Sequence, residues 1–411
     1  MISGSKVGGG AVRFEIKDGC AVAYPEGRIS SANAAEVQRE LTELADDSRV
    51  RELVVDAENL KYISSAGLRV LLALAKKRGG TLAVRNVSPE VYEIFEMTGF
   101  TSILDVRRRL REISVDGCEI VGRGEVGTVY RIDEDTIVKV YELPDSVPMI
   151  ENEQKRAKQA FLKGIPTAIS YDIVRVGEKY GSVFEMLKAS TYNDVLRSAP
   201  ERKAEIVRDY ARFLRRLHGV AVEPGELPDV RDVYRGYLDV VRKLLPEALF
   251  DRLHALFSAM PEDLHVIHGD IHMKNIMLDG TEPLLIDMDA LSAGDPVFDL
   301  QGVFVTYQLF GEDDPDNTQR FLGISQELAD YVWEKTLEYY FDGLGASALE
   351  EEKNRIRIVA YVRFLYLLAE YGSDTEERNQ RRIGHTLEHL QALAHRVDSL
   401  QIRPEVGRKK A

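Results

Sequence analysis

The chain has 411 residues, of which 44% are hydrophobic and 30% are charged, and its formal net charge at pH 7 is −14. This length exceeds what one ordinary hydrophobic core accommodates, so we expect two or three domains. The composition excludes a disordered chain, and the negative charge argues against nucleic acid as the main partner, because a phosphate backbone requires a basic face. The charge favours a cationic substrate, although acidic surfaces also serve solubility.

The cysteines and the apolar segments indicate the compartment. Cys20 and Cys118 are far apart and lack metal-ligand spacing, which argues against a disulfide framework and indicates a reducing environment. Residues 1–10 lack the apolar core of a signal peptide, and no window approaches the roughly 20 apolar residues that a membrane-spanning helix requires. We therefore expect a cytoplasmic protein with no membrane association.

The first segment of the chain alternates short strands with helices. Residues 12–24 form an alternating apolar pattern around a Lys17-Asp18-Gly19 turn, which predicts a β-hairpin. Amphipathic helical patterns follow after Ser30 and after Ile63, with apolar strand-like runs between them. This alternation predicts a compact α/β domain over residues 12–105.

A basic run over residues 107–111 follows this domain, and we predict that residues 106–117 are a linker. Residues 118–188 are mostly strand-like, with one helix near 151–162. Residues 189–400 are almost entirely helical in pattern. The sequence therefore predicts a two-lobed α+β domain, with a β-rich lobe followed by an α-rich lobe.

Three glycines, Gly122, Gly124 and Gly127, form a G-x-G-x-x-G pattern. In a dinucleotide-binding fold such glycines lie between a strand and a helix, whereas in a kinase they lie in a hairpin above the phosphates of ATP. The residues that follow, 128–132 and 136–141, are β-branched and aromatic on both sides of a polar turn. The pattern therefore favours the hairpin and an ATP site.

Lys139 lies inside the second strand of this hairpin, between two valines. A buried lysine is costly unless its charge is used, and the phosphates of ATP would use it. A lysine on an edge strand that reaches solvent is the simpler alternative, but the adjacent glycine loop favours the ATP site. We expect Glu153, or else Glu151, to orient the ammonium group from the following helix.

The strongest motif is His-Gly-Asp-Ile-His-Met-Lys-Asn at residues 268–275, followed by Asp287 after a short strand. Phosphoryl transfer requires a carboxylate that accepts the proton of the attacking hydroxyl and oxygen ligands that hold magnesium. We predict that Asp270 is this base and that Asn275 and Asp287 hold Mg²⁺.

His268 and His272 have the spacing of two zinc ligands on a helix. However, Gly269 stands where a zinc protease has its general-base glutamate, and no third ligand follows. We therefore expect His268 to support the structure of the loop.

Residues 118 to about 400 resemble the aminoglycoside phosphotransferase and choline kinase group of the protein-kinase-like fold. The resemblance lies in the motif around Asp270, in Leu217-His218 before it and in the segment from Gly294 to Leu300 after it. It implies a structural role for Asp299, which would brace the catalytic loop from a helix start. It also implies that the backbone of residues 184–187, which include Glu185 and Leu187, binds adenine.

The segment between Asp287 and Asp299 indicates the substrate class. It is too short for the activation segment and the Ala-Pro-Glu motif on which protein kinases bind peptides. We therefore expect a small-molecule hydroxyl acceptor. Four acidic positions in the helical tail either line a site for an amine or are surface charges: Glu370, Asp374, Glu376 and Glu377.

Residues 12–105 resemble STAS domains, the anti-sigma-factor antagonist family. The resemblance lies in residues 62–72, which contain Ser64-Ser65-Ala-Gly-Leu, and in residues 97–104. It implies that Ser65 is phosphorylated by a partner kinase and that an anti-sigma factor or another regulatory protein binds this domain. The usual preceding aspartate is Ser64 here. A helix N-terminus accommodates phosphate, but both serines also suit a purely capping role.

Three hypotheses follow. The leading hypothesis is an ATP- and Mg²⁺-dependent phosphotransferase acting on a small hydroxyl compound, with the STAS domain as its regulator. The alternative is a partner-switching anti-sigma-factor antagonist whose kinase-like domain binds nucleotide without turnover. The third is that the kinase-like domain phosphorylates Ser65 itself, against which the short segment after Asp287 argues.

Overall fold

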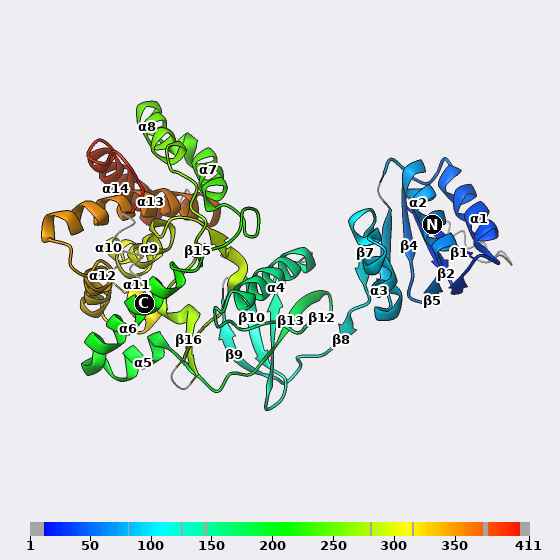
Figure 1. The fold of residues 1–411 in the computed structure, drawn as a ribbon, viewed down its shortest axis with the longest axis horizontal. Helices are drawn as coiled ribbons and strands as arrows, with labels where there is room; N and C mark the ends of the chain where they lie inside the picture. Colours follow the sequence, from blue (N-terminus) through cyan, green and yellow to red (C-terminus); the bar gives the residue numbers. More distant parts are fainter. Residues whose placement is uncertain are drawn as a thin grey trace. The chain divides into compact units, whose positions relative to one another are not determined.

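The computed structural model describes residues 12–80, 82–124, 126–143, 146–279, 282–314, 316–372 and 377–402. The chain divides into two compact units (Figure 1). The first comprises Met1–Ser114 with Val174–Gly177, and the second comprises Val115–Ile173 with Glu178–Ala411.

The first unit contains a five-stranded sheet of order β1-β2-β4-β6-β7. Strands β1 and β2 are antiparallel, and the other neighbouring pairs are parallel. The strands β2 and β4 bury every second residue, which is the pattern of a sheet with one face on the core. The sheet strands are β1 (Val12–Lys17), β2 (Cys20–Pro25), β4 (Glu52–Asp56), β6 (Ala83–Val87) and β7 (Asp105–Arg108).

Three helices and a smaller strand pair complete this unit. β3 (Gly27–Ile29) and β5 (Leu60–Ile63) pair in parallel, and α2 begins two residues after β5. The helices are α1 (Ala34–Asp46), α2 (Ser65–Lys77) and α3 (Pro89–Met97).

Residues 106–117, where we expected a linker, contain strand structure. β7 pairs with β6 at the edge of the five-stranded sheet, and β8 (Arg111–Glu112) pairs in parallel with Val174 and Arg175. Arginines are compatible with an edge strand because charged side chains there discourage pairing with another chain. The basic run therefore belongs to the first unit.

The second unit begins with a β-rich lobe, in which strands lie in the order β13-β11-β10-β9. The glycine pattern opens the antiparallel pair of β10 and β11, in which Gly127 lies opposite Tyr141 and Val129 lies opposite Lys139. The elements are β9 (Glu119–Arg123), β10 (Gly127–Arg131), β11 (Thr136–Tyr141), α4 (Val147–Leu162), β12 (Asp172–Val176) and β13 (Lys179–Glu185).

The remainder of this unit is largely helical. The helices are α5 (Tyr192–Ser198), α6 (Lys203–Leu217), α7 (Val230–Val241), α8 (Glu247–Ser258), α9 (Val297–Phe304), α10 (Phe310–Glu312), α11 (Asn317–Leu322), α12 (Gln326–Tyr340), α13 (Ala346–Tyr371) and α14 (Glu377–Ala394). Five short strands accompany them: β14 (Ser190–Thr191), β15 (Val266–Ile267), β16 (Ile276–Asp279), β17 (Glu282–Leu285) and β18 (Ser292–Ala293).

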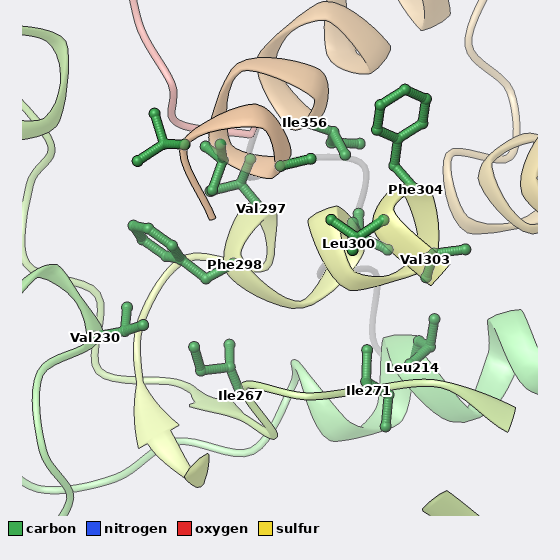
Figure 2. Packing of buried hydrophobic residues seen from close by; sticks show 14 of the residues in the cluster. Leu214, Val230, Ile267, Ile271, Val297, Phe298, Leu300, Val303, Phe304 and Ile356 are labelled. Atoms are coloured by element: carbon green, nitrogen blue, oxygen red, sulfur yellow. The ribbon is translucent and has the colours of Figure 1, made fainter. Parts of the chain in front are cut away.

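Helix α9 lies at the centre of the core of this lobe. All its residues are buried, as expected for a helix surrounded by other elements. Figure 2 shows Leu300 and Phe304 of α9. They lie in one hydrophobic cluster with Leu214 of α6, Ile356 of α13 and Ile271 of the loop after β15. Full burial of each such side chain stabilises the fold by roughly 1.5–3 kcal/mol, which makes α9 a rigid support. Among the helices of the described ranges, none has the length and apolarity to cross a membrane.

Candidate active site

Lys139 on β11 lies between two carboxylates, Glu153 of the β-rich lobe and Asp287 after β17. Its Nζ lies 2.5 Å from Oδ1 of Asp287 and 3.5 Å from Oε2 of Glu153 on α4. Burial favours the neutral amine, but the two carboxylates outweigh it and raise the pKa of Lys139 above its usual value. The hydroxyl of Tyr141 donates a hydrogen bond of 2.7 Å to Glu153 and so fixes that carboxylate. Lys139 is therefore a permanent, oriented cation.

The glycine loop begins where β10 approaches β11 most closely. A Cβ on Gly127 would lie 2.3 Å from the carbonyl oxygen of Val140, whereas a Cβ on Gly122 would meet only Val129, at 3.5 Å. The N–H of Gly124 donates to the carbonyl of Gly127 over 2.9 Å and closes the turn. Gly127 is thus required by the backbone approach.

We expect Gly127→Ala to destabilise the second unit by about 1–3 kcal/mol, because the added methyl group meets backbone that has no room to shift. Thermal unfolding measures the loss. Gly122→Ala is the matched control, since its added methyl makes ordinary van der Waals contact. Equal stability of the two variants would contradict the close approach.

The residues with which we expected adenine to interact lie at the end of β13. Glu185 is its last residue and lies opposite Thr136 of β11, and Leu187 follows two positions later. Between them, the N–H of Met186 donates to the carbonyl of Asp135 over 2.8 Å. The segment is therefore fixed against the hairpin that carries Lys139.

Asp270 lies in the loop after β15 and is paired with an arginine that sequence reasoning missed. The Arg363 guanidinium on α13 donates to Oδ1 of Asp270 and to the carbonyl of Gly269, each over 2.6 Å. Burial alone would raise the pKa of Asp270, but Arg363 lowers it below the usual value, so the carboxylate is ionised at neutral pH. Its side chain is 42% exposed and remains accessible. An arginine within the apolar run 356–368 was the signal in the sequence.

Asn275 and Asp287 flank Asp270 from two sides. Nδ2 of Asn275 donates to the backbone carbonyl of Asp270 over 2.9 Å, and the N–H of Ile286 donates to the carbonyl of Asn275 over 3.0 Å. Asp287 has a φ of 64°, a left-handed conformation uncommon for a residue with a Cβ. The structure thus brings together Asp270, which we expected to be the base, and the two residues that we expected to hold magnesium.

A second carboxylate, Asp289, makes this site strongly acidic. Burial first, and then the charges of Asp287 and Glu153, raise the pKa of Asp289 to about 6, although Lys139 opposes the shift. Lys139 and, near Asp289, Arg156 face these three carboxylates. Hard divalent cations prefer oxygen ligands, so the side-chain oxygens of Asn275 and Asp287 suit a magnesium ion that the phosphates of a nucleotide also bind. Sequence reasoning assigned Asp289 no role.

Asp299, at the start of α9, holds the loop that carries Asp270. Its Oδ2 accepts from the N–H of His268 over 2.8 Å and its Oδ1 accepts from the N–H of Gly269 over 2.6 Å. Nε2 of His218 lies 3.0 Å from the same carboxylate, and its Nδ1 lies 2.8 Å from the Tyr340 hydroxyl. Burial opposes the charge, but these donors lower the pKa of Asp299 below its usual value. The carboxylate is a buried anchor for the loop.

His268 has no nitrogen left for a metal. Its Nε2 lies 3.0 Å from the carbonyl of Ile286, to which it donates, and its Nδ1 accepts from the N–H of Asp270 over 3.3 Å. Throughout the described ranges, no group of three or more His, Cys, Asp and Glu side chains is arranged to bind a metal. The histidine therefore connects the loop of Asp270 to the end of the neighbouring strand.

A pocket of about 620 Å³ opens beside Asp270. This volume lies in the range typical of small-molecule sites. A π-helical turn, Val305–Leu309, interrupts the helix after α9, and two of its residues, Val305 and Thr306, line the pocket. Such turns occur frequently at functional sites. His272 of the Asp270 loop also lines the pocket, and most of the other lining residues come from α11, α13 and α14. These include Asn317, Phe321, Leu367, Asn379 and Arg382.

In the first unit, Ser64 and Ser65 have different positions. Ser64 is the N-cap of α2, and its side chain accepts from the N–H of Gly67 over 3.3 Å. Ser65 is the first residue of the helix, and its side chain is exposed. Only Ser64 caps the helix, so the hydroxyl of Ser65 is accessible to a modifying enzyme.

Ser64→Ala should therefore destabilise the first unit by about 1 kcal/mol, as loss of an N-cap usually does, whereas Ser65→Ala should change its stability by less than about 0.5 kcal/mol. Chemical denaturation of both variants measures the difference. A larger loss for Ser65→Ala would contradict the capping arrangement.

Comparison with known families gives a match for each unit. Residues 118–337 match the model of the phosphotransferase enzyme family, and residues 11–113 match the model of the STAS domain. Over 92 residues the chain is 42% identical to the putative anti-sigma factor antagonist BtrV of Bordetella bronchiseptica, which covers 22% of this chain and 78% of that protein. Over 83 residues it is 29% identical to the anti-sigma-B factor antagonist of Bacillus subtilis. This match covers 20% of this chain and 74% of that protein.

Solved structures with a similar fold include the ADP-bound aminoglycoside phosphotransferase APH(2'')-Ib, at 16% identity and a TM-score of 0.45. That match covers 74% of this chain and 98% of the other. A choline/ethanolamine kinase family protein from Mesorhizobium loti matches at 18% identity and a TM-score of 0.43, over 71% of this chain and 90% of that one.

Proposed function

The chain belongs to the phosphotransferase enzyme family and carries a STAS domain before that family's domain, and from this premise we propose that it transfers the γ-phosphoryl group of ATP to a hydroxyl group of a small molecule. The observation that carries the proposal is the position of Asp270. Its ionised carboxylate lines a pocket of about 620 Å³, and Arg363 occupies only its Oδ1. The second oxygen remains for an acceptor hydroxyl.

The step itself is a displacement at phosphorus. The acceptor oxygen forms a bond to the γ-phosphorus while the bond between that phosphorus and the β–γ bridging oxygen breaks, and the hydroxyl proton passes to Asp270. ADP leaves with the electron pair of the broken bond. Arg363 fixes the carboxylate through one oxygen, and Asp299 fixes the backbone that carries it.

The residues that would bind the nucleotide lie mainly in the β-rich lobe. Lys139, oriented by Glu153, would neutralise phosphate charge, and the loop with Gly122, Gly124 and Gly127 would cover the phosphates. The backbone at Glu185 and Leu187 would bind adenine. Asn275 and Asp287 would hold Mg²⁺, which supplies charge neutralisation at the transferring phosphoryl group.

The acceptor is a small molecule in this proposal. Only a short 3₁₀ turn, Met288–Ala290, and β18 lie between Asp287 and α9, so this segment offers no platform for a peptide. The pocket beside Asp270 is of a size that suits a small polyhydroxylated compound.

The STAS domain regulates this activity in our proposal. Its exposed Ser65 lies at the N-terminus of α2, where free backbone N–H groups and the helix dipole favour a phosphate group. Phosphorylation at this position would change which regulatory protein binds, and an anti-sigma factor is the partner class that its relatives' names indicate.

The proposal is tested by incubating the purified full chain with ATP, Mg²⁺ and a panel of hydroxyl compounds while ADP formation is followed. We expect at least one acceptor to accelerate ADP formation. If no acceptor does so, or if phosphate is released only to water, the proposed function is wrong.

A further inference from the structure

The pocket beside Asp270 has an excess of positive charge. Among the described residues that line it, the charged side chains are Asp270, Arg363 and Arg382. Asp270 and Arg363 neutralise each other over 2.6 Å. The charge of Arg382 on α14 is therefore the one that an acceptor would meet.

Arg382 is buried but incompletely satisfied. It is 8% exposed, and its Nη2 lies 3.4 Å from the carbonyl of Phe310 and 3.9 Å from Oδ2 of Asp314. Within the part of the chain that the structure describes, its buried Nε has no hydrogen-bond partner. Because an unsatisfied buried donor is costly, this side chain gains from a shift that gives it a further acceptor.

The carboxylate nearest to Arg382 is shared with other arginines. Asp314 also forms an ion pair with Arg320 and a second one with Arg378 over 3.0 Å. Asp314 thus faces three guanidinium groups, and Asp313 is a second carboxylate that acts on Arg382. Asp314 does not neutralise Arg382 alone, and the pocket wall retains positive charge.

The other polar groups of the pocket are neutral. Burial above all lowers the pKa of His272, so its imidazole is uncharged at neutral pH, and its buried Nδ1 has no hydrogen-bond partner among the residues described. Of the acidic positions considered for an amine site, Glu370 and Glu377 do not line the pocket, and Asp374 and Glu376 lie outside the described residues. No described feature of the pocket favours a polycationic acceptor.

We propose that the acceptor carries an anionic oxygen group, a carboxylate or a phosphate, in addition to its hydroxyl groups, and that Arg382 binds this group. This inference rests on the proposed function and names its substrate class. The guanidinium of Arg382, whose Nη2 has only long contacts of 3.4 Å and 3.9 Å, offers its Nη donors and its positive charge to such a group. The neutral lining, with His272, Asn317 and Asn379, then contacts the hydroxyl groups.

Four compounds with the same hydroxyl chain test the charge: gluconate, sorbitol 6-phosphate, sorbitol and 1-amino-1-deoxysorbitol. Binding of each to the full chain is measured by the thermal shift at increasing concentration, at constant ionic strength. We expect the two anions to stabilise the protein at lower concentrations than sorbitol, and the amine to have no effect. Comparing gluconate with sorbitol 6-phosphate shows whether the site prefers a carboxylate or a phosphate group.

Arg382→Gln should weaken the binding of the better anion about tenfold or more, because a charge-assisted hydrogen bond is lost. Arg381→Gln is the matched control: it removes a charge from the same helix, but Arg381 pairs with Glu377 and does not line the pocket, so binding should be unchanged. Arg382→Lys keeps the charge and should retain part of the affinity. If Arg382→Gln does not fold, binding of the four compounds to the wild type and to Arg382→Lys still tests whether the pocket prefers an anion.

Three results would each overturn the inference: tighter binding of the amine than of the anions, no binding of either anion, or equal losses of affinity in Arg382→Gln and Arg381→Gln. The readout is binding, so it is independent of turnover. Anions that bind through Arg382 to a protein that never consumes ATP would contradict the proposed function and leave the charge preference of the pocket standing.

Discussion

Replacement of Asp270 by asparagine should lower the rate of phosphoryl transfer by about 10²- to 10⁴-fold, the usual contribution of a general base. The amide has nearly the same shape, and its oxygen still accepts a hydrogen bond from Arg363, but it does not accept a proton. Nucleotide affinity should therefore change little. ADP formation at saturating acceptor gives the rate, and titration with a non-hydrolysable ATP analogue gives the affinity.

The control for this variant is Asp239→Asn. Asp239 is an exposed carboxylate on α7, in the same lobe, and its loss should leave both quantities unchanged. If Asp270→Asn keeps more than about a tenth of the activity, Asp270 is not the base, since that loss is smaller than general-base catalysis contributes.

Asp299→Ala should have the largest effect on stability. The carboxylate is completely buried and accepts hydrogen bonds from the N–H groups of His268 and Gly269, with His218 as a third partner. Removing it leaves all three without an acceptor, at a cost of about 3–5 kcal/mol in the free energy of unfolding. Chemical denaturation, followed in the transition of the second unit, measures this loss.

Asp209→Ala provides the comparison, because Asp209 forms an exposed ion pair with Arg212, at 3.2 Å. This variant should lose less than about 1 kcal/mol in the free energy of unfolding. If Asp299→Ala is no more destabilising than Asp209→Ala, Asp299 does not anchor the loop.

The contribution of Asp299 also depends on pH. Its pKa in the folded protein is lowered, so its stabilising effect is fully present above the unfolded pKa of about 4 and is lost as the pH falls through the folded pKa. The difference in stability between the wild type and Asp299→Ala should therefore be constant near neutral pH and shrink below about pH 4. A difference that grows on acidification would contradict the depressed pKa.

The order of lobes was predictable from the sequence, and the predicted fold class is confirmed. The hairpin of β10 and β11 followed from β-branched residues on both sides of a turn, and the short motif 268–275 placed Asp270 and Asn275 in one loop. These predictions succeeded because the determining residues are close in the sequence. Each local pattern specifies a conformation without knowledge of its neighbours.

Arg363 and Arg382 were not predicted, because their roles depend on packing between distant segments. Arg363 meets Asp270 across 93 positions in the sequence, and Arg382 contacts Phe310 across 72. A lone arginine in an apolar helix indicates that its charge has a partner, but the sequence does not identify that partner. The basic run 107–111 was misleading for a different reason. Its arginines suggested a solvated linker, although charged residues are also common on edge strands such as β7.

The central claim is that this chain phosphorylates a small molecule, and the fate of the γ-phosphate tests it most directly. The full chain is incubated with ATP labelled in the γ position and a metabolite extract, and the label is followed in the small-molecule and protein fractions. We expect label on a new small molecule, absent with Asp270→Asn. Label that remains on ATP, or that appears only on the protein at Ser65, would contradict the account.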